Sequence, residues 1–152
     1  MPIRPTMEIK PEDAQALLGS GLVGVNLAQM RRLRPQGTPS VIDLIRTGRV
    51  RYSRLDPTEH WQTYEQIVRD VQSQGWTDAD CEDLASLVAA EYQFTGEDPG
   101  AQVHVYGTGP NLSHVVVRRS NGALEDPSVA AGMGSAVQRE RDNRVAAALG
   151  IR

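Results

Sequence analysis

Apolar residues in the first two-thirds of the chain recur at helical spacing, with glycine and proline marking the interruptions. The strongest stripe predicts a helix from about Ala79 to Thr95, and a second stripe predicts a helix over 58–73. The glycines of segment 19–26 are expected to break helical structure there. Shorter helices are predicted over 11–18, 27–34, 41–47 and, near the C-terminus, 135–148.

The apolar period changes to two after Pro99-Gly100. Alternation predicts strands over 101–107 and 113–119, and Asn121-Gly122 predicts a hairpin turn into a short return strand at 123–125. Segment 49–54 also alternates and is expected to form a short strand. The predicted fold class is therefore α+β, with a long helix packed on a small antiparallel β-sheet and with extra N-terminal and C-terminal helices.

Three segments of different character are expected within a single compact domain. Residues 1–48 form an N-terminal arm with short helices, residues 49–134 form the core, and residues 135–152 form a charge-rich C-terminal helix. A chain of 152 residues is of ordinary size for one domain.

Composition narrows the class of protein. With 39% hydrophobic and 23% charged residues the chain matches a soluble globular domain, and no apolar run is long enough to span a membrane. The N-terminus has no apolar signal-peptide region, so the expected location is the cytoplasm. Cys81 is the only cysteine, which excludes an internal disulfide and cysteine-rich zinc sites; the three histidines have no ligand spacing, so no metal or cofactor is expected.

Charge is distributed in two blocks. Residues 31–54 hold seven arginines and one acid, whereas residues 56–98 hold eleven acids and one arginine. The blocks are expected to form two solvated faces, or else to dock a charged partner or support self-assembly. The net charge of −3 argues against a nucleic-acid binder, and Tyr52 is the one aromatic residue of the basic block that could stack on a base.

Three residues with complementary chemistry follow one another along the predicted elements. Cys81 lies in the first turn of a helix, where unpaired N–H groups favour a thiolate and can stabilise an oxyanion. His114 begins a strand and could take the thiol proton, and Asp126 ends the return strand and could orient the imidazole. A two-residue turn at Asn121-Gly122 would place Asp126 opposite Val117, so a bulge or a strand end is needed to bring it to His114.

These residues resemble the transglutaminase-like cysteine peptidase superfamily, in its short bacterial and phage-encoded form. The matching runs are residues 80–85 (DCEDLA), 113–117 (SHVVV) and 122–127 (GALEDP), within a region that covers about residues 50–133. Residues 61–63 (WQT) also resemble a stretch that precedes the cysteine helix in such proteins. The resemblance implies a papain-like α+β fold in which Cys81 is the nucleophile, His114 the general base and acid, and Asp126 the orienting group.

The chain departs from that pattern beside the cysteine. Ala79 stands where the family often has glycine, and four acids surround the thiol: Asp78, Asp80, Glu82 and Asp83. Like charges raise the pKa of a thiol, so His114 has to offset them.

Each residue also has a structural interpretation. Cys81 could be a packing residue, His114 a satisfied strand histidine and Asp126 a turn former. His104 on the preceding strand is the competing base, His60 is expected at the surface, and Glu125 is a weaker orienting group because neighbours on a strand face opposite sides. Trp76 either lines a substrate cleft or covers the cysteine helix. The candidate oxyanion amides are Gln62, Gln72 and Gln74.

The leading functional prediction is a thiol hydrolase or acyltransferase that cleaves peptide or isopeptide bonds through an acyl-thioester. One alternative is a structural or adaptor protein of a phage particle, partnered with a capsid or tail protein, in which the triad is weakly active or vestigial. A second alternative is a hydrolase of cell-wall peptides.

Overall fold

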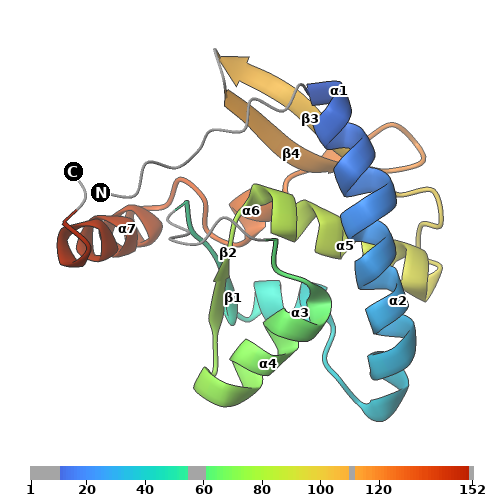
Figure 1. Cartoon of the computed structure of the whole chain (residues 1–152), viewed down its shortest axis with the longest axis horizontal. Coiled ribbons are helices and arrows are strands. Elements are labelled where there is room, and N and C mark those ends of the chain that lie inside the picture. The colour runs from blue at the N-terminus through green and yellow to red at the C-terminus, as the bar shows by residue number, and fades with distance from the viewer. Residues whose placement is uncertain (1–10, 55–60, 110–111, 151–152) are drawn as a thin grey trace.

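The computed structural model describes residues 11–54, 61–109 and 112–150, and it has an α+β fold (Figure 1). The α-helices are α1 (Pro11–Ala16), α2 (Val23–Leu33), α3 (Val41–Arg46), α4 (Tyr64–Gln74), α5 (Cys81–Thr95), α6 (Pro127–Ala130) and α7 (Ala136–Ala148). A π-helical segment, Leu17–Leu22, joins α1 to α2, and a 3₁₀ turn, Arg34–Gln36, follows α2. The strands are β1 (Val50–Tyr52), β2 (Thr77–Ala79), β3 (Gln102–Gly109), β4 (Leu112–Arg118) and β5 (Leu124–Glu125).

Helix α5 forms the centre of the molecule. It packs against α2, β4, α3 and α6, and its side chains from Asp83 to Tyr92 are all buried (Figure 1). The three-stranded antiparallel sheet has the order β3-β4-β5, and four valines on one of its faces, Val103, Val105, Val115 and Val117, are buried. The opposite face carries His104, Tyr106 and His114 together with the buried Val116, since side chains alternate along each strand.

A second, smaller sheet consists of β1 and β2 in parallel. Its register pairs Val50 with Thr77 and Tyr52 with Ala79. The strand over 49–54 was predicted and is confirmed, but β2 was not predicted because three residues are too few to show a period. This pairing brings the end of β1 beside the residues that lead into α5.

The N-terminal helices differ from the prediction. Segment 19–26 was expected to break the helix, yet the chain is helical from Pro11 to Leu33 and passes through the π-helical turn. A glycine in a helix costs about 1 kcal/mol relative to alanine, but Leu18, Leu22 and Val23 are all buried in the core. Packing of this apolar face outweighs the weak helix propensity of the glycines.

Helix α4 begins later than predicted, at Tyr64, and residues 58–60, which include His60, lie outside the described residues. The side chains of α2 fix this start. Asn26 Oδ1 accepts the backbone N–H of Tyr64 at 2.9 Å, and Gln29 Oε1 accepts that of Glu65 at 2.8 Å. Because the first N–H groups of a helix lack partners within it, these contacts determine where α4 can begin.

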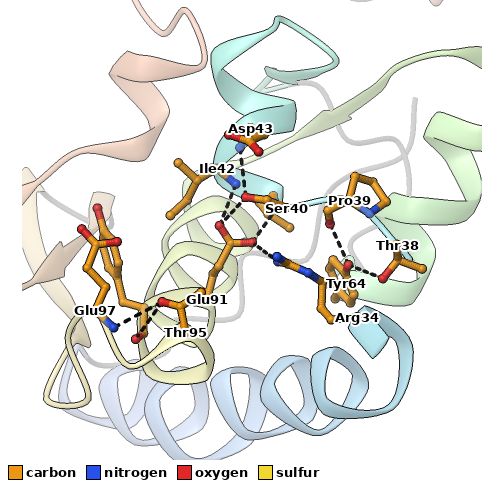
Figure 2. Close-up of polar contacts among 12 residues, drawn as sticks. Arg34, Thr38, Pro39, Ser40, Ile42, Asp43, Tyr64, Glu91, Thr95 and Glu97 are labelled. Carbon is orange, nitrogen blue, oxygen red and sulfur yellow. Dashed lines mark hydrogen bonds and ion pairs between the residues drawn. The ribbon is translucent and has the colours of Figure 1, made fainter. Parts of the chain in front are cut away.

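The basic and acidic blocks of the sequence lie against each other. Arg32 pairs with Glu65 at 2.9 Å, and Arg51 lies 3.2 Å from Asp78. Inside the protein, the buried carboxylate of Glu91 accepts hydrogen bonds from Arg34, from the hydroxyl of Ser40 and from the first backbone N–H groups of α3 (Figure 2). Part of each block is therefore neutralised within the chain, and Glu91 lies inside the protein rather than on a solvated face.

Candidate functional site

Cys81 occupies the first position of α5. Asp80 caps this helix by accepting the Asp83 backbone N–H at 3.0 Å, and Asp83 accepts the Asp80 N–H in return, which completes a capping box. The thiol is partly buried, and its sulfur interacts with the backbone N–H of Val115 on β4. The cysteine helix and the histidine strand therefore meet at the residue that follows His114.

The electrostatic surroundings of Cys81 favour the neutral thiol. Burial, followed by the negative charge of Asp80, raises its pKa to about 12, and Glu82 and Asp83 add to the effect. The Val115 N–H acts in the opposite direction, since it stabilises the thiolate. Burial and the acids together thus outweigh the favourable field at the start of the helix, and the acids act in the direction that the sequence indicated.

His114 and Asp126 form a hydrogen-bonded pair. His114 Nε2 lies 2.7 Å from Asp126 Oδ2, and the two side chains are only 13% and 27% exposed. The other carboxylate oxygen of Asp126 accepts the backbone N–H of Ser128 at 3.0 Å and so caps α6. Because both oxygens are engaged, the carboxylate is fixed, and Nδ1 is the ring nitrogen available for a further proton transfer.

The pair forms because the hairpin register differs by one residue from the prediction. The Arg119 N–H bonds the Ala123 carbonyl at 2.8 Å, and Gly122 adopts φ +87°, so the loop has three residues rather than two. Val117 consequently pairs with Glu125. In the predicted register Asp126 would share the core face of Val117, whereas the observed register places it across from Val116, on the face of His114.

His104, the competing base, lies on the same face as His114. Its ring stacks on Tyr106 with centroids 6.1 Å apart, and Tyr106 meets the His114 ring edge-on at 5.7 Å. Tyr106 thus stands between the two histidines in the series of ring contacts. Glu125 binds Arg119 at 2.6 Å and accepts the Tyr92 hydroxyl at 2.7 Å, away from the imidazole.

Gln62 lies beside the first turn of α5, but its side chain holds β2. The backbone N–H of Gln62 donates to Asp83 Oδ1 at 2.9 Å, while its amide nitrogen donates to the Asp78 carbonyl at 2.8 Å. Its neighbour Trp61 donates from the indole to Glu82 at 2.7 Å. Both residues therefore brace the segment that carries Cys81.

The other candidate residues lie at the far end of β2 from the cysteine. Gln72 and Gln74 are exposed on α4, and Trp76 precedes β2 and stacks against the Arg51 guanidinium at 3.7 Å. Cys81 follows β2, and a strand advances about 3.3 Å per residue. The structure does not bring these three side chains to the thiol.

Tyr52 is the site residue that sequence reasoning missed. It is 6% exposed, ends β1 and lies opposite Ala79, two residues before Cys81. Alternation in segment 49–54 places Tyr52 on the same face as Val50. That signal says nothing about the thiol unless the pairing of β1 with β2 is known.

A small cavity of about 230 Å³ lies elsewhere, lined by residues such as Gln15, Gly19 and Val103. Among the described residues, no group of three or more His, Cys, Asp or Glu side chains could hold a metal ion. No helix in the part of the chain that the structure describes has the length and apolar character needed to cross a membrane. Comparisons with protein-family models, curated proteins and solved structures found no match to this chain.

Proposed function

We propose that the chain is a thiol hydrolase or acyltransferase of the transglutaminase-like class, acting on peptide or isopeptide amides from a papain-like core. The observation that carries the proposal is the His114–Asp126 pair at 2.7 Å on the strand whose next residue, Val115, contacts the Cys81 sulfur. A nucleophile at a helix start, an imidazole on the adjoining strand and a carboxylate behind it together match the requirements of acyl transfer.

The reaction would proceed in two steps. His114 takes the thiol proton as the Cys81 sulfur attacks the amide carbonyl, and it then protonates the departing amine, which leaves an acyl-thioester on Cys81. Water or a second amine attacks the thioester, His114 accepts the proton of that nucleophile, and the thiol is restored. Asp126 holds the imidazole and stabilises its positive charge in both steps.

The raised pKa of Cys81 defines the resting state in this proposal. A thiol with a pKa of about 12 is neutral near pH 7, so the proton moves to His114 during attack rather than beforehand. Cell-wall stem peptides are one substrate class with suitable amide bonds. Activity on them that Cys81→Ala abolishes would assign the protein to that class.

The decisive experiment uses the fact that the chain has one cysteine. The acyl probe p-nitrophenyl acetate should give a stoichiometric burst of p-nitrophenolate with the wild type and none with Cys81→Ala. Unfolded wild type in denaturant, which has the same thiol without the site, is the matched control and should react more slowly at pH 7. Equal burst rates for folded and unfolded protein would remove the enzyme proposal.

A second candidate function is that of a structural or adaptor protein, such as a phage capsid or tail component. The observation in its favour is α7, which carries exposed apolar residues at Val137 (66%) and Val145 (41%). The test is sedimentation of the full chain between low and high salt. Salt-dependent assembly favours this candidate, and a monomer at every salt concentration removes it.

A further inference from the structure

Tyr52 is held firmly at the end of β1. Its backbone N–H donates to the Ala131 carbonyl at 3.0 Å, and its carbonyl accepts Arg141 Nη2 at 3.2 Å. The next residue, Ser53, donates its N–H to the Ala79 carbonyl at 2.9 Å. These contacts fix the strand on both sides, so the position of the ring is set by the backbone.

The phenol oxygen of Tyr52 differs from those of the other buried tyrosines. The Tyr64 hydroxyl bonds Thr38 and Pro39, each at 2.7 Å, and the Tyr92 hydroxyl bonds Glu125. Within residues 11–54, 61–109 and 112–150, the Tyr52 hydroxyl makes no hydrogen bond, although the side chain is only 6% exposed. The hydroxyl oxygen is not one of the buried side-chain atoms that lack a partner, so it reaches solvent and is available to a ligand.

Burial raises the pKa of Tyr52 to about 12, and the next largest influence is the negative charge that Cys81 carries when it is ionised. Asp80 and Asp142 raise this pKa further, whereas Arg54 lowers it. Coulomb interactions weaken with distance, which agrees with the strand register that puts Tyr52 beside the entry to α5. The phenol stays protonated near neutral pH and can therefore act as a hydrogen-bond donor.

We infer that the Tyr52 hydroxyl donates a hydrogen bond to the acyl oxygen of the carbonyl group that Cys81 attacks. This inference rests on the proposed function and assigns the oxyanion donor within it. The glutamine nearest to the cysteine helix, Gln62, already donates its amide to the Asp78 carbonyl, whereas the Tyr52 hydroxyl is uncommitted. When the sulfur adds to the carbonyl carbon, the π electron pair moves to oxygen, and Tyr52 stabilises that charge without giving up its proton.

The test compares two reactions of the same thiol in Tyr52→Phe. With p-nitrophenyl acetate, sulfur adds to a carbonyl, an oxyanion forms, and collapse to the acetyl-thioester expels p-nitrophenolate. With iodoacetamide, sulfur displaces iodide from a saturated carbon and no oxyanion forms. Loss of one oxyanion donor lowers the rate by about 10²–10³-fold, so acylation should fall by that factor while alkylation stays within about threefold.

Tyr64→Phe is the matched control, because it removes the hydroxyl of a fully buried tyrosine that bonds Thr38 and Pro39 instead. It should lower the melting temperature and leave both reaction rates of the folded protein unchanged. If Tyr52→Phe acylates as fast as the wild type, the inference is overturned and the proposed function stands. If acylation and alkylation fall equally, Tyr52 acts on the thiol, which also overturns it.

A wild type that acylates no faster than its unfolded form overturns the inference together with the proposed function. If Tyr52→Phe does not fold, 3-fluorotyrosine at position 52 keeps the hydroxyl and makes it more acidic. Because the phenol must be protonated to donate, acylation should be lost at a lower pH in the fluorotyrosine variant than in the wild type. If the pH dependence of the acylation rate does not move, the result counts against Tyr52.

Discussion

The buried carboxylate of Glu91 gives the sharpest stability prediction. Its Oε1 accepts Arg34 Nη1 and the Val41 N–H, each at 2.8 Å, and its Oε2 accepts the Ser40 hydroxyl at 2.6 Å and the Ile42 N–H at 3.2 Å (Figure 2). Glu91→Gln preserves the shape but replaces one oxygen with an NH₂ group, which is a donor facing two donors.

The magnitude follows from what the substitution leaves unpaired. The Ser40 hydroxyl can rotate, but a backbone N–H of α3 or the Arg34 guanidinium then has no acceptor, and the charge opposite Arg34 is lost. A buried unsatisfied group costs about 1–3 kcal/mol, and breaking a buried ion pair costs about 3–5 kcal/mol. We therefore expect Glu91→Gln to lower the free energy of unfolding by about 3–5 kcal/mol, out of a total of about 5–15 kcal/mol.

The assay is urea unfolding followed by the fluorescence of Trp61 and Trp76. The matched control is Glu65→Gln, the same change at an ion pair in which Arg32 is 54% exposed, and it should cost less than about 1 kcal/mol. If the two variants differ by less than about 1 kcal/mol, the carboxylate network does not stabilise α3 as argued.

Three further predictions concern the site and the pH dependence. Asp126→Asn keeps a helix-capping side chain but loses the charge behind His114, so acylation should fall by about 10²–10⁴-fold with little change in melting temperature; an unchanged rate would contradict the orienting role. Asp80→Asn keeps the cap of α5 and removes a negative charge, so the pKa of Cys81 should fall below about 12. Iodoacetamide should then alkylate the folded protein faster at pH 8, and a slower reaction would contradict the electrostatic argument. Hydrogen bonds, above all the one from the backbone N–H of Ser120, lower the pKa of Asp98 to about 2. The stability that Asp98 contributes is therefore present above about pH 4 and is lost as the pH falls towards 2. The melting temperature of Asp98→Asn should fall less over this pH range than that of the wild type.

Much of the local structure could be predicted because it depends on short-range patterns. The apolar stripe of α5, the alternation of β3 and β4, and a short helix within 41–47 (α3, Val41–Arg46) all occur as expected. These features depend on residues within a few positions of one another, where side-chain period and capping chemistry act directly. The order of Cys81, His114 and Asp126 along helix, strand and hairpin is likewise visible in the sequence.

The boundaries that failed were set by residues distant in sequence. Helix α4 starts where Asn26 and Gln29 of α2 supply acceptors, and the glycines of segment 19–26 remain helical because their apolar neighbours are buried. The pairing of β1 with β2 joins residues about 27 positions apart, as in Tyr52 with Ala79. None of these partners can be identified from a local window.

The sequence by itself determined the residue types and the elements that carry them: a lone cysteine opening a helix among four acids, a histidine on a strand and an aspartate before proline. Only the tertiary structure decided which faces these residues share. A single extra loop residue moved Asp126 from the valine face to the histidine face, because strand side chains alternate and a shift of one reverses every side chain. The same three-dimensional arrangement placed Tyr52 opposite Ala79, two residues before Cys81, through a parallel strand pair too short to leave a pattern in the sequence.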